Sequence, residues 1–165
     1  MSQSSKIKTL HIVRHGKALQ DYLRIDDIDR PLIEKGIHNN IAVATRLVDK
    51  YAIPDIIISS PAARALHTAH IFARVMGFPP EKVTAYEKLY FKGEEALEIL
   101  CEISDEIESA MIVGHNPDVT YLAGSFTRSL TDSLPTSGVA TIRFETEQWC
   151  NISRSTTLNA EFIRP

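Results

Sequence analysis

The chain has 165 residues, of which 44% are hydrophobic and 24% charged, with only 7 glycines and 8 prolines. This composition is typical of a folded globular protein and excludes a disordered or collagen-like chain, and at this length we expect a single domain over residues 1–165. The formal net charge of −3 at pH 7, with lysines and arginines scattered along the chain, argues against nucleic acid or a membrane surface as a partner.

The location expected from the sequence is the cytoplasm. No apolar run approaches the roughly 20 residues that span a bilayer, and the polar N-terminus does not resemble a secretory signal. Cys101 and Cys150 are the only cysteines, and neither has a second cysteine near it in the sequence. We therefore expect neither a disulfide framework nor a zinc cluster, and a reducing compartment is the default.

Short apolar runs alternate with longer amphipathic ones along the chain. The short runs are typical of strands buried inside a parallel sheet, and prolines and glycines separate them from helical patterns. The predicted strands cover residues 7–13, 55–59, 82–86, 109–114, 139–144 and 156–163, and the predicted helices cover 34–51, 61–76, 94–107 and 117–126. This order predicts an α/β fold with a mostly parallel sheet, and the last two strands, with no helix between them, predict an antiparallel strand near the C-terminus.

Two finer features of the helices can be predicted. The first helix should turn one apolar side toward the sheet, formed by Ile37, Ile41, Ala44, Leu47 and Val48. The helices that follow residues 60 and 116 each have a capping residue and then a proline at the first helical position, namely Ser60 with Pro61 and Asn116 with Pro117.

Three of the predicted strands end in residues that suit phosphate chemistry. The first strand runs into Arg14, His15 and Gly16, the strand over 55–59 is followed by Arg64, and the strand over 109–114 is followed by His115. Because ligands bind outside the carboxyl ends of the strands in open α/β sheets, we expect these side chains to meet. Taken alone, Arg64 reads as a solvated surface arginine and His115 as a turn or core histidine.

The same edge of the sheet should attract an anion. Two helix N-termini and two arginines point toward it, although the chain as a whole is slightly acidic. A phosphate group is the expected ligand, because an arginine guanidinium can bind two of its oxygens at once.

The segments IVRHGKA, RPLIEKG, SSPAARALHTA, VGHNP and LPTSGVATIRF occur in this order. The sequence resembles the histidine phosphatase superfamily over residues 10–165, and within it the short SixA-like phosphohistidine phosphatases. The resemblance implies a phosphoglycerate-mutase-like three-layer sandwich with helices on both faces of the sheet. It also implies that His15 is a nucleophile that becomes phosphorylated, that Arg14 and Arg64 hold the phosphoryl oxygens, and that His115 completes the pocket.

These implied roles agree with the chemistry of the residues. A neutral imidazole is a competent nucleophile if its other nitrogen donates a hydrogen bond, and we expect a backbone carbonyl near Gly16 to accept it. The arginines and histidines supply the charge that phosphoryl transfer needs, so no metal or other cofactor is expected. His67 and His70 have a spacing that could hold zinc, but no further ligand lies near them in the sequence, and a solvated helix face is favoured.

The proton donor and the residues at the pocket mouth are less clearly marked. Glu87 is the best-placed candidate for the general acid, with a solvated glutamate as the alternative. Asp26, Asp27 and Asp29 are rival donors or plain loop residues. Arg30 belongs to the RPL segment and either lines the pocket mouth or forms a structural salt bridge.

The function expected from the sequence is therefore a metal-independent phosphatase that acts through phospho-His15. The preferred substrate is phosphohistidine in a protein, because a short chain has little room for a lid over a small molecule. A phosphatase for small metabolites, such as a sugar phosphate or a nucleotide, is the nearer alternative. A phosphate-binding module without catalysis is the other, although binding alone does not need a nucleophile.

Overall fold

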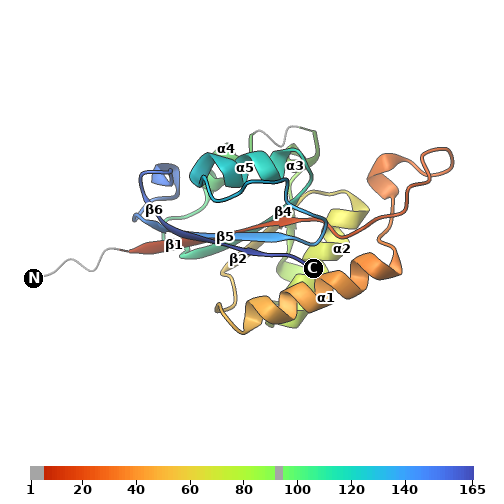
Figure 1. Cartoon of the computed structure of the whole chain (residues 1–165), viewed down its shortest axis with the longest axis horizontal. Helices are drawn as coiled ribbons and strands as arrows, with labels where there is room; N and C mark the ends of the chain where they lie inside the picture. The colour runs from red at the N-terminus through yellow and green to blue at the C-terminus, as the bar shows by residue number, and fades with distance from the viewer. Residues whose placement is uncertain (1–5, 92–94) are drawn as a thin grey trace, which may run out of the picture.

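The structure is a computed structural model that describes residues 6–91 and 95–165. Six strands form one sheet in the order β3-β2-β4-β1-β5-β6, and helices cover both of its faces (Figure 1). The strands are β1 (Ile7–Arg14), β2 (Ile56–Ser59), β3 (Thr84–Ala85), β4 (Ser109–Gly114), β5 (Val139–Glu145) and β6 (Thr157–Ile163). This confirms the predicted three-layer α/β sandwich.

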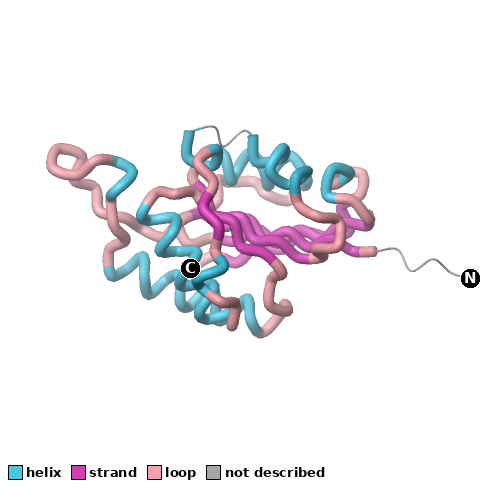
Figure 2. Tube along the Cα trace, turned by 180° about the vertical axis from the view of Figure 1, so that it is seen from behind, coloured by secondary structure: helices cyan, strands magenta, loops and turns pink. Residues whose placement is uncertain are grey.

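In the part of the chain that the structure describes, two helices lie on one face of the sheet and three on the other. The first pair is α1 (Glu34–Val48) and α2 (Ala63–Met76), and the other three are α3 (Lys88–Phe91), α4 (Ala96–Glu102) and α5 (Asp118–Phe126). Short 3-10 turns complete the described elements, namely η1 (Asp27–Asp29), η2 (Pro80–Lys82) and η4 (Trp149–Asn151). Figure 2 shows the same layers from behind, with the sheet between the two sets of helices.

The apolar strands produce a core on each side of the sheet. In β1, Leu10 and Ile12 point to the side covered by α4 and α5, while Val13 points to the side of α1 and α2. Side chains alternate between the faces of a strand, so a strand that is apolar throughout must be covered on both faces. The sheet therefore lies in the middle of the molecule, and polar residues gather where its strands end.

The direction of the strands explains the change of pattern near the C-terminus. β1 pairs in parallel with β4, β4 with β2, and β2 with β3. β5 is antiparallel to both of its neighbours, β1 and β6. The antiparallel strand predicted near the C-terminus is thus β5, and the edge strand β6 runs in the same direction as β1.

The helices differ from their predicted bounds and faces. α1 ends at Val48 rather than residue 51, and Ile41 and Val48 are exposed although they were expected to face the sheet. Asn40 is buried instead, because its side-chain amide donates to the Thr68 hydroxyl of α2. Glu94, at the start of the helix predicted over 94–107, lies outside the described residues, and α4 covers only Ala96–Glu102.

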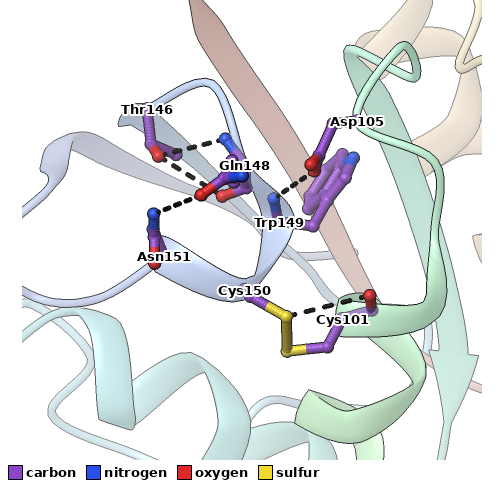
Figure 3. Close-up of a disulfide and its surroundings, with 7 residues drawn as sticks. All are labelled: Cys101, Asp105, Thr146, Gln148, Trp149, Cys150 and Asn151. Carbon is purple, nitrogen blue, oxygen red and sulfur yellow. Dashed lines mark hydrogen bonds between the residues drawn. A yellow bond between two sulfur atoms is a disulfide. The ribbon is translucent and has the colours of Figure 1, made fainter.

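The expectation that the cysteines stay unpaired is wrong. Cys101, in the last turn of α4, and Cys150, in η4, form a disulfide with their Cα atoms 4.5 Å apart (Figure 3). Their sequence separation of 49 hides a tertiary contact, because α4 packs against η4. The cytoplasmic location therefore loses the support it drew from the cysteines and stays a prediction. None of the helices in the described part of the chain has the length and apolar character needed to cross a membrane.

Candidate active site

The order of the strands brings three chain segments to one edge of the sheet. β4 lies between β2 and β1, so the residues that follow these strands are neighbours in space, as expected. They surround a cleft of about 380 Å³, lined by Arg14, His15, Lys17, Ala18, Gln20, Tyr22, Arg30, Arg64, His115, Asn116 and Thr136. The structure thus brings together His15, Arg14, Arg64 and His115, and places Arg30 beside them.

His15 is held in a single tautomer. Its Nδ1 lies 2.7 Å from the Gly16 carbonyl oxygen, and because a carbonyl only accepts hydrogen bonds, Nδ1 must carry the proton. The lone pair is then on Nε2. Burial is the main reason that the pKa of His15 falls to about 4, with a further contribution from Arg64 and Arg14, so the ring is neutral at pH 7.

Gly16 is required at its position by close packing. A Cβ atom there would lie 2.7 Å from Asn40 Nδ2 and 3.0 Å from the Gly36 carbonyl oxygen. The Gly16 N–H also donates to the Thr68 hydroxyl at 3.0 Å. The glycine therefore lets α1 and α2 approach the turn that positions His15.

His115 faces His15 across the cleft. The two ring centroids are 5.1 Å apart, and His115 Nε2 lies 2.7 Å from the Ser60 hydroxyl oxygen. Burial, followed by the electrostatic influence of His15 and Arg64, lowers the pKa of His115 to about 3. Its Nδ1 is buried and makes no hydrogen bond within the described residues. Two neutral histidines therefore stand side by side in a positive environment.

The two arginines are anchored through their terminal nitrogens. Arg14 Nη1 donates to the Leu134 carbonyl oxygen at 2.9 Å, and Arg64, which is only 5% exposed, donates through Nη1 and Nη2 to Asp27. The Nε atoms of both arginines are buried without a partner among the residues that the structure describes. Burial of this kind excludes the alternative that Arg64 is a solvated surface residue.

Asp27 connects the positive side chains of the site. Its carboxylate accepts hydrogen bonds from Arg30 Nε at 2.9 Å, Arg64 Nη2 at 3.0 Å and the Tyr90 hydroxyl at 2.8 Å. Although burial acts to raise its pKa, the hydrogen bonds from Tyr90, Arg64 and Arg30 lower the pKa of Asp27 to about 2. An ionised carboxylate has no proton to give, so Asp27 is an acceptor here and not the rival proton donor.

Arg30 combines both interpretations made from the sequence. It lines the cleft and also forms a salt bridge with Asp27 at 2.9 Å. Glu87, in contrast, is exposed and lies outside the set of residues that line the cleft. Its role as general acid stays a prediction.

The predicted helix caps are wrong. α2 begins after Ala62 and α5 after Pro117, and neither helix has a side-chain cap. Ser60 contacts His115 instead, and the Asn116 amide donates to the Leu134 carbonyl oxygen that also receives Arg14. Both side chains therefore serve the site, although the Ser60 hydroxyl also accepts from the Ala62 N–H at 3.3 Å and the Asn116 side-chain oxygen from the Thr120 hydroxyl of α5 at 2.6 Å.

Several residues of the site were missed by sequence reasoning. Tyr22 and Thr136 line the cleft, and Tyr90 reaches both Asp27 and His115, whose ring centroid is 5.7 Å from its own. Only Thr136 had a signal, because it lies in the LPTSG segment. Within residues 6–91 and 95–165, no three His, Cys, Asp or Glu side chains gather closely enough to hold a metal ion.

A neutral histidine, a second histidine and two anchored arginines at the carboxyl edge of a parallel sheet suit the handling of a phosphoryl group. The model of the histidine phosphatase superfamily (branch 1) matches residues 10–99. The chain therefore belongs to this superfamily. No curated protein matches it.

Solved structures support the same assignment. A candidate phosphohistidine phosphatase SixA from Agrobacterium tumefaciens is 26% identical, with a TM-score of 0.79 over 96% of this chain and 98% of that one. A second candidate SixA, from Nakamurella multipartitia, has a TM-score of 0.80 at 19% identity and covers 96% of each chain. A phosphoglycerate mutase from Bacillus anthracis has a TM-score of 0.61 at 20% identity over 90% of this chain and 92% of that one. The last two likenesses establish the phosphoglycerate-mutase-like fold.

Proposed function

We propose that the protein is a metal-independent phosphatase that removes the phosphoryl group from phosphohistidine in a protein, with His15 as the nucleophile. The observation that carries the proposal is the tautomer of His15, whose Nδ1 proton is held by the Gly16 carbonyl. This arrangement leaves the Nε2 lone pair available for attack on phosphorus. The family to which the chain belongs supports the general activity.

The proposed reaction has two steps. His15 Nε2 forms a bond to phosphorus as the bond from phosphorus to the substrate nitrogen breaks, and the substrate ring, already protonated on its other nitrogen, leaves as a neutral imidazole. Water then attacks the phosphorus of phospho-His15, and the bond from phosphorus to Nε2 breaks. Both protons of the water leave with the inorganic phosphate, and the His15 ring returns to its neutral form with the proton on Nδ1. Arg14 and Arg64 compensate the charge on the phosphoryl oxygens in both steps, and the buried N–H groups of their Nε atoms are donors of the kind that phosphoryl oxygens satisfy.

Two observations support phosphohistidine as the substrate. Asp27, the carboxylate that joins the arginines of the cleft, stays ionised because its pKa is about 2, and a protonated imidazole leaves without needing a strong acid. An alkyl phosphate would need one. Exposed side chains such as Lys17, Gln20 and Tyr22 form the mouth of the cleft, which leaves it accessible to a protein surface.

The first test is a search for the phosphoenzyme. The protein is mixed with radiolabelled phosphohistidine protein and quenched in alkali, where phosphohistidine is stable and phosphoserine is not. We expect label on the wild type and on His38→Ala, an exposed histidine of α1, and none on His15→Ala. Label on His15→Ala, or unchanged turnover by it, would disprove the mechanism.

The second test ranks substrates by kcat/KM. The panel holds a phosphohistidine protein, phosphoserine and phosphotyrosine peptides, a sugar phosphate and a nucleotide, and the phosphohistidine protein should exceed the others at least about tenfold. Arg64→Lys should lower every value, whereas Arg74→Lys, on the exposed side of the same helix, should not. A sugar phosphate or nucleotide at the top of the ranking would replace the proposal with a phosphatase for small metabolites.

A further inference from the structure

The loop between β1 and α1 carries an unusual group of exposed apolar side chains. Leu19 is 37% exposed, Tyr22 66% and Leu23 98%, and all three lie within residues 19–25, which we name the docking loop. In Figures 1 and 2 the chain between β1 and α1 extends away from the sandwich at the end where β1 stops. Single exposed apolar residues are common, but three within residues 19–23 of one projecting loop concentrate apolar surface there, and we call these three side chains the apolar patch.

The docking loop is fixed to the cleft at its base. The Leu19 N–H donates to the Pro31 carbonyl oxygen at 2.9 Å, and Arg30 Nη1 donates to the Leu19 carbonyl oxygen at 2.7 Å. The Arg30 guanidinium also lies 4.9 Å from the centre of the Tyr22 ring, in the range of a cation–π contact. The residue that binds Asp27 inside the site therefore also sets the position of the loop.

The apolar patch continues from the cleft to the outside of the molecule. Tyr22 lines the cleft, and Leu23, the next residue, is almost fully exposed. A phosphoryl group held by Arg14 and Arg64 would therefore lie at the inner end of this patch. A sugar phosphate inside the cleft would leave Leu23 in water, whereas the surface around a phosphorylated residue of a protein would cover it.

We propose that the docking loop binds the protein substrate itself, through an apolar patch that flanks the phosphohistidine of a folded partner domain. This inference rests on the proposed function and names the partner surface that the site recognises. Tyr22 is of a residue type that is enriched among interface anchors, and the almost fully exposed Leu23 adds apolar surface beside it that a partner can bury. The loop then selects protein-borne phosphohistidine, while the cleft selects the phosphoryl group.

The test is a cycle between the loop and the flanks of the substrate. Two versions of a designed helical bundle carry one surface histidine, phosphorylated with phosphoramidate, with leucines or serines one turn away on either side. Free phosphohistidine is the third substrate. The enzymes are the wild type, Leu23→Ser, and Leu158→Ser, which changes a 50% exposed leucine of β6.

We expect the wild type and Leu158→Ser to prefer the leucine-flanked bundle about tenfold in kcat/KM, mainly through KM, and Leu23→Ser to lose this preference. Turnover of free phosphohistidine should agree within about twofold for the three enzymes. The docking inference would be overturned if the wild type had the same kcat/KM on both bundles. It would also be overturned if Leu23→Ser lowered kcat/KM on free phosphohistidine as much as on the leucine-flanked bundle. Self-association of the wild type, or its binding to neutral lipid vesicles, would overturn the inference as well if Leu23→Ser abolished it. A wild type inactive on all three substrates would instead refute the proposed function.

Discussion

A single carboxylate, that of Asp27, holds two of the three arginines that line the cleft. The carboxylate accepts hydrogen bonds from Arg64 Nη2, from Arg30 Nε and from the Tyr90 hydroxyl. Charge-assisted hydrogen bonds of this kind are about twice as strong as neutral ones and fix the plane of the guanidinium. Asp27 is thus a positioning residue, and the sequence showed it only as one of three aspartates in a loop.

Asp27→Asn should lower kcat/KM for an aryl phosphate about tenfold, because the amide keeps the shape but weakens the two charged contacts, each worth about 1.5–3 kcal/mol. Asp29→Asn, in the same turn and exposed, is the matched control and should act like the wild type. Equal kcat/KM in the two variants, or a gain of activity in Asp27→Asn, would contradict the positioning role.

The protonation of His15 can be measured directly. Since burial lowers its pKa to about 4, the ring should remain neutral from pH 7 down to about pH 5 and gain a proton only near pH 4. Protonation removes the attacking lone pair, so kcat/KM should decline with falling pH in that lower range and not near pH 6.5. NMR titration of the ring protons, assigned with His15→Ala, gives the pKa, and a midpoint near 6.5 would contradict the buried environment.

Among the elements, the buried strands were the most predictable. β4 has its predicted bounds, Ser109–Gly114. A short run of apolar residues is stable only when both faces of the strand are buried, so the ends of the run mark the ends of the strand. The starts of α2 and α5 were predicted wrongly because capping rules consider only local contacts, whereas Ser60 and Asn116 also bind groups that are distant in the sequence, namely His115 and the Leu134 carbonyl. The exposed face of α1 was misjudged for the same reason, because Asn40 is buried by a partner on α2.

Two glycines provide an opposite pair of stability effects. Gly16→Ala should destabilise the protein by about 1–3 kcal/mol, because its Cβ would press on Asn40 and on the Gly36 carbonyl. Gly124→Ala, in α5, has nothing within 4 Å of the added Cβ and should stabilise by roughly 0.5–1 kcal/mol through helix propensity. Urea unfolding of the two variants measures both effects. If Gly16→Ala unfolded at the same urea concentration as the wild type, the tight approach of α1 would be contradicted.

For the molecule as a whole, pairing between distant segments was the part that the sequence concealed. The positions of His15, Arg64 and His115 followed from a general rule about strand ends in α/β sheets. No such rule joins α4 to η4, so the Cys101–Cys150 disulfide emerged only from the assembled fold.

Reduction of this disulfide should cost the protein about 2–4 kcal/mol of unfolding free energy, because the bond links two residues with a sequence separation of 49 and so restricts the unfolded chain. Urea unfolding with and without dithiothreitol measures the change. Cys150→Ser should unfold at the midpoint of the reduced wild type and should not respond to dithiothreitol. If the wild type gives the same midpoint in both conditions, the bond does not contribute to stability.

The position of β1 between β4 and β5 has a consequence for the order in which the protein folds. Val13, two residues before His15, pairs with Val139, and the Arg14 side chain is held by the Leu134 carbonyl. Each of these contacts joins residues more than 100 positions apart. Such contacts form slowly, because the chain loses conformational entropy before the contact stabilises it. A ribosome must therefore complete most of the chain before β1, the strand that leads to His15, acquires its second neighbour, and until then β1 exposes an unpaired edge to chaperones and to aggregation.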